Sequence, residues 1–208
     1  VNTTGFVHGP GRVLKGFKIE TVQPDVIIAL EQGGELRAIL HPYRHYRILR
    51  LQPSPLAAAK TPGQRRAARE HAFGAYFSTA SEISLAFRQV IFQRSLLFTG
   101  RKLHETAYVH AEHTAEGLLA VSAGVESGRP RGRVLPQGFE RSLLCGVADR
   151  RNHGLGLALL RQLDFAQEIL TLRTPVSTDR IRVLQFGALY LDDQGRELST
   201  HVPPGVVG

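Results

Sequence analysis

The chain has 208 residues, of which 42% are hydrophobic and 21% are charged, a balance typical of a folded globular protein and not of a disordered one. No apolar run approaches the roughly 20 residues that a membrane-spanning helix needs. The single cysteine, Cys145, excludes an internal disulfide and a zinc site built from several cysteines.

The net charge of +8 rests mainly on arginine, because only four of the 26 basic residues are lysines, which leaves 22 arginines. Arginine offers a planar, forked donor that matches phosphate oxygens two at a time. The composition is therefore compatible with a nucleic acid or a nucleotide as the ligand. It is equally compatible with an ordinary solvated basic surface.

The first 77 residues predict alternating helices and strands. Residues 26–30 (VIIAL) form a continuous apolar run, as expected for a strand buried on both faces of a parallel sheet. Residues 47–51 are a second strand candidate. Helices are expected at residues 13–22, 35–40 and 62–76, the last with Pro62 in the favoured early position.

From about residue 82 the pattern predicts strands separated by turn residues, at residues 118–125, 143–148, 169–176 and 181–191. Residues 155–163 fit a helix or a strand, and we interpret them as a strand because Leu155, Leu157 and Leu159 alternate. Residues 192–195 (DDQG) predict a turn, and the apolar neighbours of Cys145 predict a buried thiol. The fold class is α/β and then mostly β, with a small barrel or sandwich in the second half.

Short segments along the chain share their order and spacing with one enzyme family. They are residues 1–11 (VNTTGFVHGPG), 23–30 (QPDVIIAL), 64–70 (QRRAARE), 75–77 (AYF), 143–149 (LLCGVAD), 154–158 (GLGLA), 174–176 (TPV), 186–189 (FGAL) and 195–197 (GRE). These segments resemble the polynucleotide 5′-hydroxyl kinases, the RNA kinases of the pre-mRNA cleavage and ribosomal-RNA-processing type. Residues 78–140 match this family poorly.

The resemblance implies an ATP-dependent enzyme with a P-loop kinase domain followed by a C-terminal β domain. Residues 1–77 would be the C-terminal part of the kinase domain, including its lid helix, and residues 78–208 the β-rich domain. The Gly-x-x-x-x-Gly-Lys-Ser/Thr loop is absent from the chain. We therefore expect the C-terminal part of a longer kinase, inactive alone, with ATP and Mg²⁺ bound mainly by residues outside it.

Arg65 and Arg69 are the candidate catalytic and cofactor-binding residues. They are four residues apart, so on a helix they share one face and can reach one ligand. In the family this element is a lid over the nucleotide phosphates, whereas the alternative is an ordinary solvated helix face. Relatives often carry further arginines where this chain has Ala72 and Gly74.

The candidate substrate-binding residues lie at the start of the chain. Phe6 stands where the family usually has a Trp that stacks on a nucleobase, and the alternative is a core Phe at a strand end. Thr3 is placed by the resemblance at the substrate phosphate or hydroxyl, with Asn2 and Thr4 as second choices. Short polar residues at a strand end also cap turns.

No metal site is expected, since the pairs His41 with His45 and His110 with His113 lack a third ligand. The partners that the resemblance implies are 5′-hydroxyl ends of RNA or DNA, ATP and other RNA-processing proteins, with no membrane. The expected location is cytoplasmic, or nuclear in a eukaryote. The alternative function is a non-catalytic RNA-binding scaffold of an RNA-processing complex.

Overall fold

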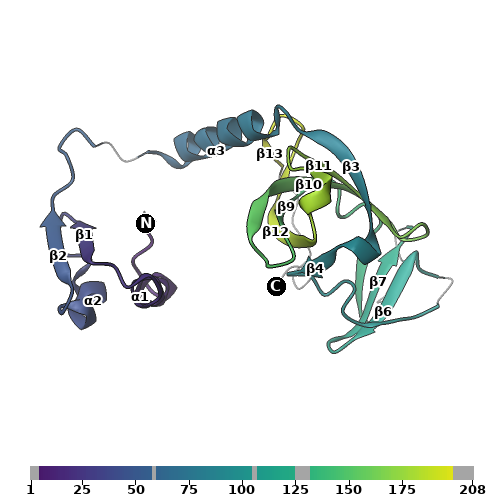
Figure 1. The fold of residues 1–208 in the computed structure, drawn as a ribbon, viewed down its shortest axis with the longest axis horizontal. Coiled ribbons are helices and arrows are strands. Elements are labelled where there is room, and N and C mark those ends of the chain that lie inside the picture. Colours follow the sequence, from purple (N-terminus) through teal and green to yellow (C-terminus); the bar gives the residue numbers. More distant parts are fainter. Residues whose placement is uncertain (1–4, 58–59, 105–106, 125–131, 199–208) are drawn as a thin grey trace. The chain divides into compact units, whose positions relative to one another are not determined.

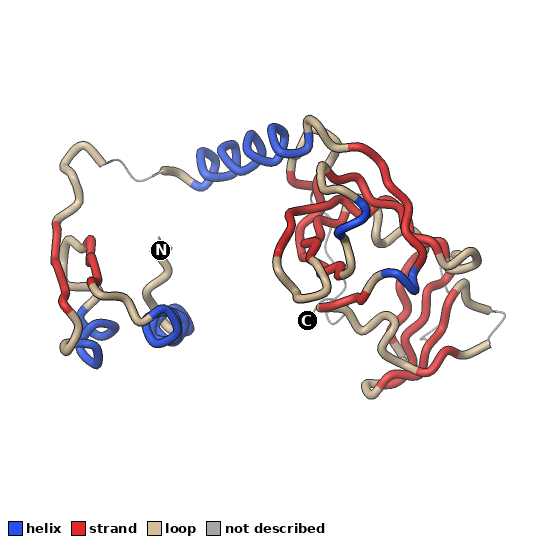
Figure 2. Tube along the Cα trace, viewed as in Figure 1, coloured by secondary structure: helices blue, strands red, loops and turns tan. Residues whose placement is uncertain are grey.

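The computed structural model describes residues 5–57, 60–104, 107–124 and 132–198. The chain divides after Lys60 into two compact units. The first contains two α-helices and a short sheet, and the second contains one long helix and mostly strands (Figures 1 and 2). None of the helices in these ranges is long and apolar enough to cross a membrane.

The first unit is a small α/β arrangement in which the predicted elements are confirmed. Its two strands pair in parallel, with Val26 opposite Arg47 and Leu30 opposite Leu51. The hydroxyl of Tyr43 donates to the Glu20 carboxylate at 2.6 Å and so ties the second half of the unit to its first helix. The elements are α1 (Pro10–Val22), β1 (Val26–Leu30), α2 (Arg37–Leu40), the 3-10 turn η1 (His41–Tyr43) and β2 (Arg47–Leu51).

Strand β1 corrects one expectation. Ala29 is buried, but the side chains of Ile28 and Leu30 are 62% and 61% exposed, so the strand is not buried on both faces. A strand is buried on both faces only when helices cover both sides of its sheet. Among residues 5–57 the sheet has two strands, and no element covers Ile28 and Leu30.

The second unit begins with helix α3 (Pro62–Phe77), which confirms the helix predicted at residues 62–76. A capping box starts it. The Thr61 hydroxyl accepts from the Gln64 backbone N–H at 3.2 Å, and the Gln64 side chain accepts from the Thr61 N–H at 2.9 Å. This reciprocal pair satisfies two N–H groups that a helix start leaves without partners.

A large sheet in the second unit has the strand order β13-β12-β9-β10-β11-β3, and β4 pairs in parallel with β12. The ambiguous stretch at residues 155–163 is a strand, as predicted, within the long β10. The strands are β3 (Ser81–Ala86), β4 (Ile91–Gln93), β9 (Leu143–Ala148), β10 (Gly154–Asp164), β11 (Ile169–Thr174), β12 (Val183–Leu191) and β13 (Glu197–Leu198). The 3-10 turns η2 (Phe87–Gln89) and η3 (Thr178–Arg180) follow β3 and β11.

A smaller sheet has the order β5-β6-β7-β8, with β7 and β8 parallel. Its strands are β5 (Arg101–Lys102), β6 (His110–Thr114), β7 (Gly117–Ser122) and β8 (Arg133–Pro136). Residues 78–140, for which the sequence offered few family-like segments, thus contain the strands of this sheet together with β3 and β4. Whether the second half forms the expected barrel or sandwich stays a prediction.

The core of the second unit joins both sheets. It includes Leu119 and Val121 of β7 together with Leu160 of β10 and Phe186 of β12. Cys145 lies in this core with no exposed surface, and burial raises the pKa of its thiol to about 12. The expectation of a buried cysteine is confirmed.

Candidate functional site: the arginine face of helix α3

Helix α3 packs by its C-terminal end against the large sheet. Phe77 is buried with Leu159 and Leu191, and the Tyr76 hydroxyl accepts from the Leu157 backbone N–H at 2.8 Å. The Arg173 guanidinium donates to the Phe77 carbonyl at 3.0 Å. These contacts hold the helix to the β-rich unit.

The helix also meets the turn between β12 and β13 through two glycines. A Cβ on Gly74 would lie 2.8 Å from the Gln194 carbonyl oxygen, and a Cβ on Gly195 would lie 2.4 Å from the Gly74 nitrogen. Gly195 has a φ of +80° and closes the predicted turn, its N–H donating to the Asp192 carbonyl at 3.0 Å. Gly74 is thus the residue that lets the helix approach the turn.

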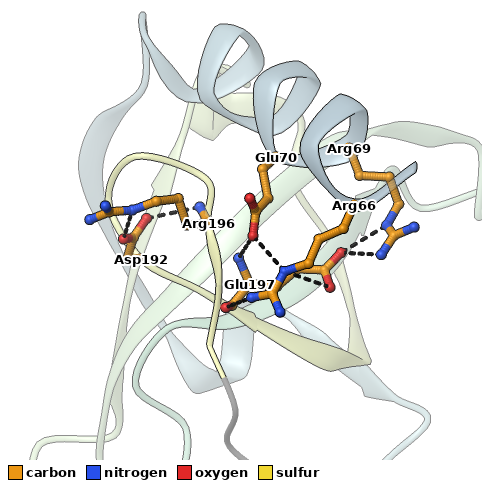
Figure 3. A network of polar contacts seen from close by, with 6 residues as sticks. All are labelled: Arg66, Arg69, Glu70, Asp192, Arg196 and Glu197. Atoms are coloured by element: carbon orange, nitrogen blue, oxygen red, sulfur yellow. Dashed lines mark hydrogen bonds and ion pairs between the residues drawn. The ribbon is translucent and has the colours of Figure 1, made fainter. Parts of the chain in front are cut away.

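The N-terminal half of α3 carries Arg65, Arg66 and Arg69, and two of these contact β13 (Figure 3). Arg69 reaches one Glu197 carboxylate oxygen through Nε at 2.8 Å and Nη2 at 2.7 Å. Arg66 donates from Nε to Glu70 at 2.9 Å and from Nη2 to the Glu197 carbonyl at 2.6 Å. Glu70 closes the network by accepting from the Glu197 backbone N–H at 3.0 Å.

The charges of this network balance. The hydrogen bond from Arg66 lowers the pKa of Glu70, and the same bond raises the pKa of Arg66. Next to them, backbone and side-chain hydrogen bonds from Arg196 lower the pKa of Asp192. Three arginines and three carboxylates thus share the face drawn in Figure 3, so a phosphate that binds Arg69 must compete with Glu197.

The predicted site residues fall in different parts of the chain. Arg65 and Arg69 share α3, and the Arg65 N–H donates to the Thr61 carbonyl at 3.0 Å. Phe6 is in the first unit, 53% exposed, with its ring close to the Gly11 backbone of α1. This exposure does not fit a core Phe, and its role as a base platform stays a prediction. Thr3, with Asn2 and Thr4, lies outside the described residues.

Sequence reasoning missed the acidic partners of the arginines. The spacing of Arg66 and Glu70, four residues apart on one helix, is a signal that predicts an ion pair. Glu197 is 128 residues from Arg69, and its only signal is its place in the family-like segment GRE. The two histidines of β6 do not converge either, since His110 is buried against Glu112 and His113 is exposed.

The domain boundary expected after residue 77 stays a prediction, because it concerns the domains of the family. Packing divides the chain after Lys60 instead and assigns α3 to the β-rich unit. The physical reason is the set of contacts above, since Phe77, Tyr76 and Gly74 all meet the large sheet or its turn.

Comparison with known proteins connects these elements to a family. Residues 1–79 match the family model described as the P-loop of the mRNA cleavage and polyadenylation factor CLP1. Over 95% of its length the chain is similar to polyribonucleotide 5′-hydroxyl-kinases, at 28% identity for that of Methanocaldococcus jannaschii, 27% for that of Pyrococcus furiosus and 29% for that of Thermococcus kodakarensis. The resemblance expected from the sequence is confirmed. The chain spans about 60% of the length of these relatives.

Two solved structures are also similar, both of complexes between Clp1p and Pcf11p. One covers 83% of this chain and 41% of its own at 12% identity and a TM-score of 0.45, and the other covers 83% and 40% at 10% identity and a TM-score of 0.44.

Proposed function

We propose that this chain is the C-terminal part of an ATP-dependent polynucleotide 5′-hydroxyl kinase, which moves the γ-phosphate of ATP to the 5′-hydroxyl of RNA or DNA. The similarity to three polyribonucleotide 5′-hydroxyl-kinases over 95% of the chain supports this proposal. The observation that carries it is the arginine face of α3, formed by Arg65, Arg66 and Arg69. This face lies within residues 1–79, the segment that matches the CLP1 P-loop family model.

The arginines suit phosphoryl transfer. Such a reaction needs positive charge beside the transferring group and precise placement of both substrates. When bound, ATP with Mg²⁺ supplies the phosphoryl group and neutralises part of its charge, with its main ligands outside this chain. Here Arg69, with Arg65 one turn before it, holds phosphate oxygens through its forked donors.

Substrate contacts come from the start of the chain. Phe6 is exposed enough to stack on a base at the 5′ end, and Thr3 with Asn2 contacts the terminal phosphate or hydroxyl. Among the described residues no group of three His, Cys, Asp or Glu side chains lies close enough to hold a metal ion. We propose charge placement and substrate binding as the role of this chain, and we expect no turnover of ATP by the chain alone.

The experiment measures transfer of labelled γ-phosphate from ATP to a 5′-hydroxyl oligonucleotide by this chain and by the product of the complete gene. Activity is expected only in the complete product. There, Arg69→Ala and Arg65→Ala should each lower kcat/KM by about 100-fold, the effect of removing one donor that stabilises a transition state. Arg88→Ala, an exposed arginine on η2, is the control and should leave the rate unchanged.

A non-catalytic RNA-binding scaffold is the second candidate. The observation that favours it is the ion pair of Arg69 with Glu197, which places a carboxylate where a phosphate oxygen would bind. RNA binding without phosphate transfer by the complete product would support the scaffold and reject the kinase. Transfer by the 208-residue chain alone would show that the missing phosphate loop is not needed.

A further inference from the structure

Two connections of the β-rich unit meet at one end of the large sheet. The turn between β9 and β10 (residues 149–153) lies beside η3 and the residues that lead into β12. The Arg182 N–H donates to the Ala148 carbonyl at 2.9 Å, and Val183 pairs with Ala148. A hollow of about 360 Å³ is lined by Asp149, Arg150, Arg151, His153, Asp179, Arg180 and Arg182.

The two carboxylates of this hollow are used within their own turns. Asp149 accepts from the backbone N–H groups of Arg151 at 2.8 Å and His153 at 3.0 Å, and these bonds lower its pKa. Asp179 accepts from the Ser177 hydroxyl, and that bond lowers its pKa, with a smaller contribution from the nearby arginine charges. Both acids therefore stay ionised and serve mainly to shape the turns.

The four arginines, called here the turn arginines (Arg150, Arg151, Arg180 and Arg182), outnumber these acids by two. Arg150, Arg151 and Arg180 are exposed, whereas Arg182 is half-buried and donates to the Ile181 carbonyl at 2.7 Å. Within the ranges that the structure describes, no ion pair joins a turn arginine to a carboxylate. Their charge is thus available to a ligand.

The chemistry of the hollow favours a phosphodiester backbone. Guanidinium groups bind phosphate oxygens in pairs and lose less hydration than lysine does. No Phe, Tyr or Trp side chain lines the hollow. Its one aromatic ring, the imidazole of His153, lies 3.3 Å from the Asp149 carboxylate, so the hollow is built mainly from guanidinium groups and not from base-stacking surfaces. Contacts of this kind fix the position of a strand without reading its sequence.

We propose that the turn arginines bind the backbone of a single-stranded polynucleotide, independently of its sequence and of its 5′ end. The choice of a polynucleotide over an acidic protein segment rests on the proposed function. The hollow then adds affinity for the substrate strand away from the group that reacts.

The test compares two triple variants of the 208-residue chain with equal loss of charge. Arg150→Gln with Arg151→Gln and Arg180→Gln removes the exposed turn arginines. Arg88→Gln with Arg101→Gln and Arg141→Gln removes three exposed arginines elsewhere. Binding of a fluorescent 20-nucleotide RNA, made with a 5′-hydroxyl and with a 5′-phosphate, is followed by anisotropy between 50 and 200 mM salt.

The turn variant should bind at least about tenfold more weakly with either RNA end. The slope of log K against log salt should fall by about 2, since three lost phosphate contacts each remove about 0.7. The control variant should keep most of the affinity. The single variants Arg150→Gln and Arg180→Gln should each lose about a third of the log K that the triple turn variant loses. These single variants keep the test decisive if the triple variant misfolds.

Three outcomes would overturn the inference. The first is an equal loss of RNA affinity in both triple variants, and the second is no loss of RNA affinity in the turn variant. The third is a turn variant that no longer binds an oligoglutamate peptide but still binds RNA. The last outcome would assign the hollow to an acidic protein. Failure of the proposed function would be seen separately, as an absence of phosphate transfer by the complete gene product. In that case, RNA binding that depends on the turn arginines would still support this inference.

Discussion

Arg69 and Glu197 are joined by two guanidinium nitrogens, Nε and Nη2, which both reach the same carboxylate oxygen at 2.8 and 2.7 Å. One residue lies on α3 and the other on β13. Because carboxylates and phosphates compete for the same fork, the charge of Glu197 should decide whether Arg69 is available to the phosphate that we propose for it.

The pair should contribute modestly to stability. Arg69→Ala, Glu197→Gln and the double variant form a cycle, and we expect a coupling of about 0.5–1 kcal/mol, since the Arg69 side chain is half exposed. Urea unfolding at 20 mM and 500 mM salt measures it, and the coupling should shrink at the higher salt. A coupling near zero at low salt would mean that the contact does not hold the helix.

Gly195→Ala should destabilise the chain through the contact with Gly74. The positive φ alone costs about 1–2 kcal/mol for a residue with a Cβ, and the new Cβ would lie 2.4 Å from the Gly74 nitrogen. Gly117→Ala is the matched control, because Gly117 also has a positive φ but has open space around it. Chemical denaturation should show a larger loss at position 195, and equal losses would argue against the close approach.

Glu112 should be one of the most sensitive positions of the smaller sheet. Its buried carboxylate accepts from the Phe98 N–H at 2.7 Å and the Gly100 N–H at 2.9 Å, and it meets His110 at 2.5 Å. Glu112→Ala leaves these groups without a partner, at a cost of about 3 kcal/mol. Glu112→Gln keeps an acceptor oxygen and should cost less, whereas Glu116→Ala, an exposed position in the same hairpin, should cost under about 1 kcal/mol. The reverse order in urea unfolding would contradict this.

Acid should weaken the fold through the same carboxylate. Burial raises the pKa of Glu112, but the bonds from His110, Gly100 and Phe98 outweigh it and hold the pKa below its ordinary value. A lowered pKa in the folded state gives stability that is present above about pH 4.3, the ordinary Glu value, and is lost as pH falls through the folded pKa. Unfolding curves from pH 7 to 3 should therefore fall more steeply for the wild type than for Glu112→Gln. Parallel curves would exclude this carboxylate as a cause.

Cys145 should be inert while the chain is folded. Burial raises the pKa of its thiol to about 12, so almost no thiolate is present at neutral pH, and the reactive form of cysteine is the thiolate. An aromatic disulfide reagent should react with less than one equivalent over hours in buffer and with one equivalent within minutes in denaturant. Rapid reaction in buffer would indicate that the core opens readily.

Local patterns in the sequence predicted most of the elements. Pro62 marked the start of α3, and the alternation of Leu155, Leu157 and Leu159 identified β10 as a strand. Both signals are contained within a few residues of the elements they predict. The capping box of Thr61 and Gln64 is equally local and could have been recognised.

Other features depend on residues far apart in the chain. The exposure of Ile28 and Leu30 follows from what covers β1, which its own apolar run does not specify. The partner of Arg69 is 128 residues away, so a spacing rule finds the shared helix face but not the carboxylate that occupies it. The turn arginines are likewise assembled from two connections that lie side by side only after β9 and β12 pair.

The close approach of Gly74 and Gly195 also limits which residues these two positions can accept. A relative with a side chain at the position of Gly74 has no room for the turn found here, because the Gln194 oxygen would lie 2.8 Å from the new Cβ. The two positions should therefore covary. A large residue at either position requires a longer or displaced turn between β12 and β13.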